Sequence, residues 1–226
     1  TNIPAGTIFA ILPMMADLEQ TLLQPGHRLI AAGFVIYGPQ TCLVLTLGDG
    51  TDIYKLDRQD RSYLCIRSAV EIAADGDEYA IDASNYRHWD KPIQAYIDEN
   101  VDGADGPRGR NFTTHWTGSL VAEAYRILVR GGIFLYPGDR REGYEKGRHR
   151  LIHEANPLAM IFEQAGGLAT DGEDRILDIQ PHKSEQRVPL MFGSRDKVER
   201  VRNFHDGTLS LGERSPLFGH RGLFRH

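Results

Sequence analysis

The stretch GSLVAEAYRILVRGGIFLYP, residues 118–137, joins an expected helix to an expected strand and decides the fold class. Apolar residues in its first half recur at i, i+4, i+7 and i+8, the spacing of one face of a helix. They are Leu120, Ala124, Ile127 and Leu128. Thr117 or Ser119 can cap the start of this helix, and Gly131-Gly132 can end it. The apolar residues 133–136 then predict a short strand before a proline.

The rest of the C-terminal half repeats this alternation. Strands are predicted near 79–81, 176–179 and 189–192, and helices over 91–99, from 156 and from 195. Asn156 is the expected N-cap of one helix, with Pro157 at its first helical position, and Ser194 is the expected N-cap of the last. Strands that alternate with helices indicate a layered α/β domain.

The residues before 72 are typical of an antiparallel meander. Strands are predicted over 6–12, 41–47, 52–56 and 62–66. The apolar run 29–37 is ambiguous between helix and strand, and 14–24 is either helix or loop. Cys42 and Cys65 both lie in strand-like sequence, so both are expected to be buried thiols in a reducing cytosol.

The composition argues against several classes of function. The 226 residues are 41% hydrophobic and carry a formal net charge of −5, which disfavours general binding to nucleic acid. An acidic chain also repels a phosphorylated substrate at long range, so such a substrate needs a local basic pocket or a metal ion. No apolar run is long enough to predict a membrane span.

Seven short strings, in one order along the chain, resemble class I fructose-1,6-bisphosphatase. They are GTIF (6–9), AAGF (31–34) with YG (37–38), GSLVA (118–122), GGIFLYP (131–137), EANP (154–157), QAGG (164–167) and LDI (177–179). The string NYRHW (85–89) and the long tail resemble the branch of autotrophic bacteria. In that branch the enzyme often also accepts sedoheptulose 1,7-bisphosphate.

This resemblance implies a layered α/β fold of stacked sheets and helices, in which 1–72 is the remainder of an N-terminal domain. Residues 73–205 are then the C-terminal α/β domain, and 206–226 an extended tail. The implied reaction is hydrolysis of the 1-phosphate of fructose 1,6-bisphosphate, with Mg²⁺, in the Calvin cycle or gluconeogenesis. The implied protein is a cytoplasmic homotetramer that binds neither nucleic acid nor membrane.

The expected metal ligands are only partly present. The family's main metal segment, Asp-Pro-x-Asp-Gly-Ser-Ser-Asn, does not occur in the sequence, which opens where that segment would just have ended. The resemblance leaves Glu154 as the one metal ligand. Without the resemblance, Glu154 is a carboxylate favoured near a helix N-terminus. One carboxylate is a poor magnesium site, so this chain alone is expected to bind metal weakly and to be inactive.

Four further residues match substrate positions of the family. Tyr136 and Tyr86 are implied to offer hydroxyl groups to a phosphate, and Arg148 is implied to hold the sugar phosphate. Trp116 occupies a position that is usually Tyr or Trp. By composition alone, Tyr136 is a core aromatic residue and 140–150 is a solvated charged loop.

Three positions depart from the family's pattern. Asp82 stands where the family usually has Asn, and an ionised carboxylate accepts hydrogen bonds but cannot donate them to a phosphate. His115 stands where an Arg normally reaches the neighbouring subunit's 6-phosphate pocket, and His153 stands where Tyr is common. We therefore expect weak binding of the 6-phosphate, improving below about pH 6.5 if His115 lies in the pocket.

Two alternatives stay open. The first is a non-catalytic sugar-phosphate-binding or regulatory protein on the same fold, which the changes at Asp82 and His115 favour. The second is another lithium-sensitive phosphatase, such as an inositol monophosphatase. The strings FLYP and EANP argue against the second.

Overall fold

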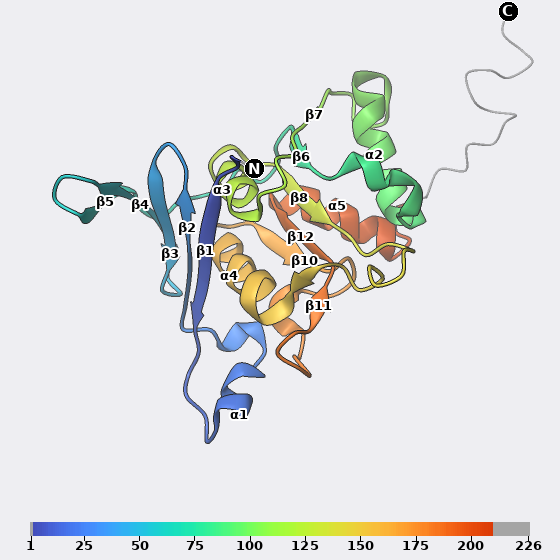
Figure 1. Cartoon of the computed structure of the whole chain (residues 1–226). Coiled ribbons are helices and arrows are strands. Elements are labelled where there is room, and N and C mark those ends of the chain that lie inside the picture. Colours follow the sequence, from blue (N-terminus) through green and yellow to red (C-terminus); the bar gives the residue numbers. More distant parts are fainter. Residues whose placement is uncertain (1, 210–226) are drawn as a thin grey trace, which may run out of the picture.

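The computed structural model describes residues 2–209 and contains two five-stranded sheets with helices packed between and beside them (Figure 1). The first sheet is an antiparallel meander whose strands follow one another along the chain. They are β1 (Ala5–Ile11), β2 (Ala31–Tyr37), β3 (Thr41–Thr46), β4 (Thr51–Asp57) and β5 (Ser62–Arg67). Between β3 and β4 the chain turns through Gly48 and Gly50, whose φ angles of 94° and 82° suit glycine.

The second sheet has the order β10-β12-β8-β6-β7. Its strands are β6 (Glu78–Ala80), β7 (Thr113–Thr114), β8 (Ile133–Tyr136), β10 (Leu168–Thr170) and β12 (Leu190–Gly193). Strand β6 is parallel to both neighbours, whereas β12 is antiparallel to both of its own. A separate pair joins β9 (His149–Arg150) to β11 (Arg187–Val188).

Helices fill the space between the sheets and cover the far face of the second. Helices α3 (Leu120–Arg130) and α4 (Asn156–Gln164) contact strands of both sheets, whereas α2 (Lys91–Asp102) and α5 (Arg195–His205) contact each other beside the second sheet (Figure 1). Helix α4 is buried from Asn156 to Phe162, as expected of a helix between two sheets. The short α1 (Leu18–Leu22) lies in the connection from β1 to β2. This architecture confirms the predicted layered α/β fold.

The stretch 118–137 folds as predicted. Helix α3 buries Ala124, Ile127 and Leu128, and the Ser119 hydroxyl caps it by accepting a hydrogen bond of 3.4 Å from the Ala122 N–H. The next strand is β8, and the ambiguous run 29–37 contains the strand β2.

One predicted cap and one predicted strand are wrong, and a second cap acts through its backbone alone. Asn156 is not an N-cap, because a π-helical turn, η4 (Leu151–Ala155), runs directly into α4 and gives Asn156 helical angles of −59° and −48°. Ser194 is the N-cap of α5, as predicted, but its hydroxyl accepts a hydrogen bond from the Gly132 N–H and makes no capping bond to the helix. The predicted strand near 176–179 is a 3-10 helix, η5 (Ile176–Asp178), closed by an ion pair of 2.8 Å between Arg175 and Asp178.

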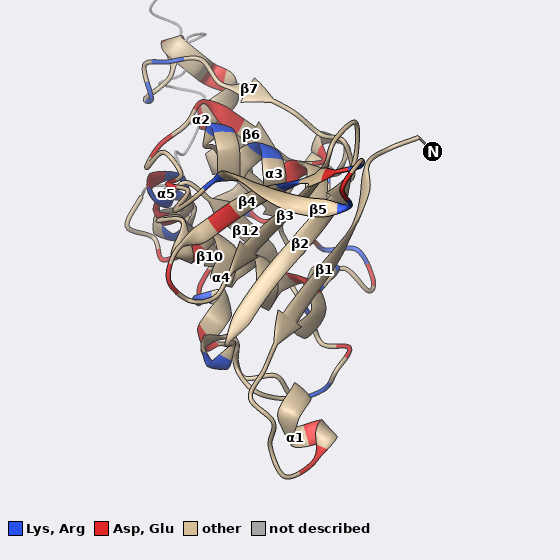
Figure 2. Cartoon of the chain, turned by 90° about the vertical axis from the view of Figure 1, so that its left-hand side faces the viewer, with Lys and Arg blue, Asp and Glu red and all other residues tan. Residues whose placement is uncertain are grey.

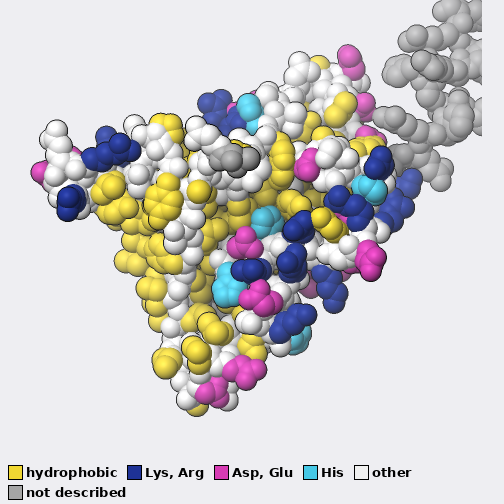
Figure 3. Space-filling model, viewed as in Figure 1, with side chains coloured by type: hydrophobic (Ala, Val, Ile, Leu, Met, Phe, Trp, Pro, Cys, Tyr) yellow, Lys and Arg dark blue, Asp and Glu magenta, His cyan; other side chains and the backbone are white. Residues whose placement is uncertain are grey.

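The face of β1, β2 and β3 that is turned away from the helices is apolar and partly exposed. Strands β1, β2 and β3 carry no charged residue (Figure 2), and hydrophobic side chains gather over the first sheet in Figure 3. Cys65 lies on the exposed β5, so the prediction of two buried thiols holds for Cys42 and is wrong for Cys65.

Two further predictions concern the ends and the membrane. Most of the predicted tail 206–226 lies outside the described residues. Among residues 2–209, no helix combines the length and the apolar character needed to cross a bilayer.

Candidate functional site

Tyr136 is the last residue of β8, at the edge where that strand leaves the sheet. Its ring lies 5.0 Å from the His149 ring, nearly perpendicular to it, and 6.2 Å from the Trp116 ring. Burial raises the pKa of the Tyr136 phenol, and the neighbouring Arg148 partly offsets this. The phenol therefore keeps its proton at neutral pH and can donate a hydrogen bond.

Arg148 belongs to a stack of two guanidinium groups on one phenol ring. The centre of the Arg148 guanidinium lies 4.8 Å from the Tyr144 ring centroid, and that of Arg141 lies 4.2 Å from it. Arg148 also donates a hydrogen bond of 2.6 Å to the Tyr144 hydroxyl, while Arg141 forms an ion pair with the buried Asp139. The stretch 140–150, which composition alone predicts to be a solvated charged loop, therefore places Arg141 and Arg148 near Tyr136. The sequence did not single out Arg141 or Tyr144.

Asp82 and its neighbours form one wall of a narrow cleft beside Tyr136. The lining residues are Ile81, Asp82, Asn85, Trp89, Leu135, Tyr136, Pro137, Asp139 and Arg141. The Asp82 carboxylate accepts hydrogen bonds from the Ser84 hydroxyl (2.6 Å) and the Asn85 amide (2.9 Å). It therefore holds the turn η2 (Ala83–His88) in place.

The structure does not bring the Tyr86 hydroxyl to this cleft. That hydroxyl donates a hydrogen bond of 2.7 Å to Asp98 of α2, and the ring packs edge-on against Trp89. Asn85, one residue earlier, lines the cleft instead. No feature of the sequence pairs Tyr86 with Asp98, twelve residues further on, so this arrangement was not predictable.

His115 and Trp116 follow the short strand β7. The His115 N–H donates to the Tyr79 carbonyl at 2.9 Å, which extends the pairing with β6, and the Trp116 ring stacks on Phe134 at 6.0 Å. Trp116 thus lies beside Tyr136, whereas among the described residues the His115 side chain makes no contact with Tyr136.

Glu154, the expected metal ligand, lies in the π-helical turn η4. Its Oε2 accepts a hydrogen bond of 2.7 Å from the Arg150 N–H, and its Oε1 lies 3.5 Å from His149 Nδ1. Burial would raise the pKa of Glu154, but the contacts with His149 and Arg150 outweigh it, and the pKa is lower than usual. The carboxylate is therefore ionised and held in one orientation.

Glu154 fits a divalent cation as one ligand among several. A hard cation prefers carboxylate oxygens, and this carboxylate is ionised and partly open to solvent. Within residues 2–209, however, no group of three Asp, Glu, His or Cys side chains is arranged to hold a metal. His153 does not add to the site, because its ring faces Glu185 at 3.9 Å and is 43% exposed.

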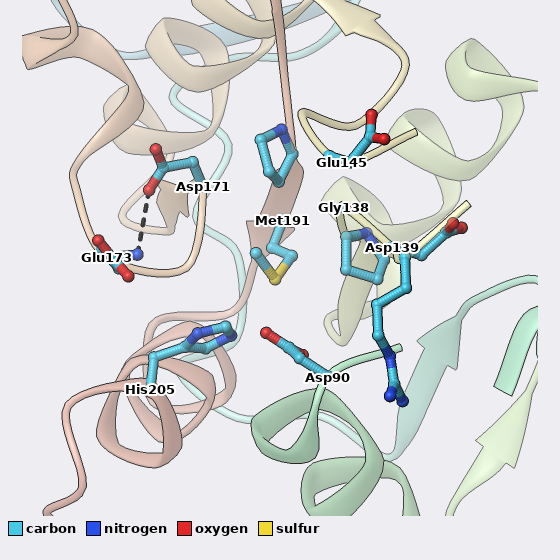
Figure 4. Close-up of a pocket in the computed structure, with 11 residues that line it drawn as sticks. Asp90, Gly138, Asp139, Glu145, Asp171, Glu173, Met191 and His205 are labelled. Carbon is cyan, nitrogen blue, oxygen red and sulfur yellow. Dashed lines mark hydrogen bonds between the residues drawn. The ribbon is translucent and has the colours of Figure 1, made fainter. Parts of the chain in front are cut away.

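A larger hollow of about 400 Å³ lies next to β8 but has the wrong charge for a phosphate. Figure 4 shows Asp90 and His205 beside it, with Met191 between them and Asp171 and Glu173 at its rim. Asp139 and Glu145 add to this acidic lining. The cleft beside Tyr136 also contains Asp82 and Asp139, but Arg141 lines it and Arg148 acts on the same phenol. Because carboxylates repel phosphate and cations attract it, this cleft is the better candidate for a phosphorylated ligand.

Comparison with known proteins points to one family. A family model described as "Fructose-1-6-bisphosphatase, N-terminal domain" matches residues 1–67, and the corresponding C-terminal model matches residues 72–206. The chain is 58% identical over 226 residues to a protein named fructose-1,6-bisphosphatase class 1 2 of Nitrobacter hamburgensis. It is 55% identical over 225 residues to a class 1 fructose-1,6-bisphosphatase of Rhodopseudomonas palustris strain BisB18.

All of this chain is covered by both matches, but it spans 66% and 65% of the two relatives' lengths. The matches thus extend over both sheets of the structure and over every residue of the candidate site. The chain belongs to the class I fructose-1,6-bisphosphatase family.

Proposed function

We propose that the protein containing this chain hydrolyses the 1-phosphate of fructose 1,6-bisphosphate and releases fructose 6-phosphate. The names of the relatives support this activity, and the arrangement around His149 supports it from the structure. The His149 ring contacts Tyr136, a candidate phosphate donor, and its Nδ1 faces Glu154, the candidate metal ligand. The His149 side chain thus lies between the candidate phosphate-binding residue and the candidate metal ligand.

The chain's own residues bind and orient the substrate in this proposal. The Tyr136 hydroxyl donates to a phosphate oxygen, and Arg148 adds a permanent positive charge close by. The Trp116 ring, 6.2 Å from the Tyr136 ring, would hold that ring in place. We also propose that Asp82, His115 and Tyr86 contribute to substrate binding. At the turn that carries Tyr86, the neighbouring Asn85 is the residue that lines the cleft.

A divalent cation, which we propose to be Mg²⁺, would polarise the phosphoryl oxygens and lower the pKa of the attacking water. Glu154 would be one of its ligands, oriented by His149 and the Arg150 N–H. In the reaction, the water oxygen bonds to phosphorus, the bond from phosphorus to the C1 oxygen breaks, and a proton passes to that oxygen.

The remaining ligands are proposed to come from the part of the relatives' length that this chain does not span. The same part is proposed to cover the apolar outer face of the first sheet, so that 1–72 is the remainder of an N-terminal domain and 73–205 the C-terminal domain. A cytoplasmic homotetramer is proposed on the same grounds of family membership.

The test is phosphate release by a full-length protein that contains this chain, with Mg²⁺ and one substrate at a time. Fructose 1,6-bisphosphate, sedoheptulose 1,7-bisphosphate and inositol 1-phosphate are compared. Turnover of fructose 1,6-bisphosphate that disappears in Glu154→Gln supports the proposal. Binding of the bisphosphate without turnover would support the second candidate, a non-catalytic sugar-phosphate-binding protein, which the carboxylate of Asp82 favours.

A further inference from the structure

Lys197, the third residue of α5, is fully buried and has an unsatisfied ammonium group. Its Nζ makes no hydrogen bond to any described residue. The nearest counter-charge is Asp75, 3.8 Å away, and the ammonium otherwise faces the ring of Phe112 at 3.8 Å from the centroid. A buried charge without hydrogen bonds is costly, so this position needs a physical explanation.

Two arginines surround the same ring. The guanidinium centres of Arg108 and Arg110 lie 4.9 Å and 5.0 Å from the Phe112 centroid. Arg108 is 3.9 Å from Asp75, and Arg110 forms ion pairs with Asp75 and with Asp77. Three cations thus face two carboxylates, which leaves one net positive charge. Lys197 and Arg108 are shielded from water, whereas Arg110 and Asp77 reach the surface.

The neighbouring face of α2 adds further unpaired polar groups. Tyr96 and Asn100 lie one helical turn apart, and both side chains are buried. Arg108 Nη1 has no hydrogen-bond partner among the described residues. The Tyr96 hydroxyl and the Asn100 amide interact with each other, but neither has a hydrogen bond of normal geometry to a described residue. Burial raises the pKa of Tyr96 well above its usual value, so its hydroxyl keeps its proton and remains a donor.

The balance of these groups indicates what occupies the space between them. Lys197, Arg108, Tyr96 and the Asn100 nitrogen all offer hydrogen atoms, while the Asn100 oxygen is the one group in this set that can only accept. Water would satisfy donors and acceptors equally but would leave the net charge uncompensated. An anion would satisfy the donors and the charge together.

We propose that this cluster, made of Lys197, Arg108, Arg110, Tyr96 and Asn100, binds one small monovalent anion of about the size of chloride. One negative charge balances the net charge of the three cations and the two carboxylates, Asp75 and Asp77. The atoms without hydrogen bonds are too enclosed to admit a sugar phosphate. Burial lowers the pKa of Lys197 to about 7, and a bound anion would raise it again by compensating the ammonium.

The anion would bridge side chains of the polar stretch 103–112 to side chains of α2 and α5, and so stabilise the packing of that stretch. Arg108, Arg110 and Phe112 all lie in this stretch, which leads directly into β7 and on to His115 and Trp116. The proposed site is separate from the cleft beside Tyr136, so the anion proposal can be tested independently of the proposed phosphatase activity.

The first test measures the melting temperature of this chain at constant ionic strength while chloride replaces gluconate, an anion too large for the site. The native chain should gain roughly 2–4 °C in chloride. Lys197→Met, which fills the same space without charge, should lose this gain, whereas the exposed Lys183→Met should keep it. An equal response of the native chain and Lys197→Met would overturn the proposal.

The second test does not depend on a variant. Crystals grown without chloride and soaked in sodium bromide should give an anomalous peak within hydrogen-bonding distance of Lys197 Nζ. The absence of a peak there, with water density in its place, would show that solvent satisfies the cluster and would contradict the anion site.

Discussion

His149 Nδ1 lies 3.5 Å from Glu154 Oε1, and the same imidazole ring packs against Tyr136 at 5.0 Å. The residue therefore links the carboxylate expected to bind metal with the phenol expected to bind phosphate. Its side chain is only 14% exposed, so the ring has little freedom to turn away. We infer that His149 orients Glu154 rather than contacting the substrate.

His149→Phe should weaken Mg²⁺ binding in the full-length protein by roughly 10- to 100-fold. Phenylalanine keeps the ring packing on Tyr136 but removes the nitrogen that faces Glu154. The measurement is calorimetric titration with Mg²⁺ in the absence of substrate. Glu154→Gln should weaken binding at least as much, and Glu185→Gln, at a carboxylate that is 63% exposed, should not. Unchanged affinity in His149→Phe would refute an orienting role.

Arg148→Met should raise KM for fructose 1,6-bisphosphate about 10-fold or more, because a charge-assisted hydrogen bond is lost. Arg148→Lys should recover part of the loss, since it restores the charge but not the forked geometry. Arg58→Met, in the exposed turn between β4 and β5, is the matched control. If Arg148→Met and Arg58→Met have the same KM, Arg148 does not bind the phosphate.

His115→Arg should lower KM about 10-fold if His115 reaches a substrate phosphate. The guanidinium would supply a permanent charge and two parallel donors, which a neutral imidazole lacks. His115→Gln, whose amide carries no charge, should leave KM near the native value. A KM that does not change in either variant removes His115 from phosphate binding, and the expected pH dependence with it.

Lys197 should make the stability of the chain depend on pH above neutrality. Its pKa is about 7 in the folded chain and ordinarily 10.5, so between these values the unfolded chain binds more protons. Stability should therefore rise with pH across this window, by up to about 1.4 kcal/mol per pH unit. Urea unfolding of the native chain and of Lys197→Met, in chloride-free buffer at pH 7 and pH 9, measures the difference. If the free energies of unfolding of the native chain and of Lys197→Met differ by the same amount at pH 7 and at pH 9, the pKa of Lys197 is not lowered.

The sequence predicted those parts of the fold that depend on local patterns. The apolar spacing in 118–137 predicted α3 and β8, because a helix with one buried face and a short buried strand both leave a clear periodic pattern. The family strings singled out Tyr136, Trp116, Arg148 and Glu154, whose roles stay predictions, and the structure brings these four residues into one neighbourhood.

The missed features depend on contacts between distant segments. Cys65 has the same strand-like surroundings as Cys42, but no described segment covers either face of β5. The π-helical turn before Asn156 leaves no local signal, because Asn-Pro is equally typical of a helix start. Tyr86 turns to Asp98, and Arg141 stacks with Arg148 across Tyr144, and neither pairing follows from spacing along the chain.

We propose that this chain supplies Glu154, Tyr136 and Arg148 to the site, and that the other metal ligands come from the part of the relatives' length that it does not span. The most direct measurement is phosphate release from fructose 1,6-bisphosphate and Mg²⁺ by the 226-residue chain alone, next to a full-length protein that contains it. We predict turnover by the full-length protein and none above background by the isolated chain. Turnover at the same rate by both would contradict the proposed division of the site.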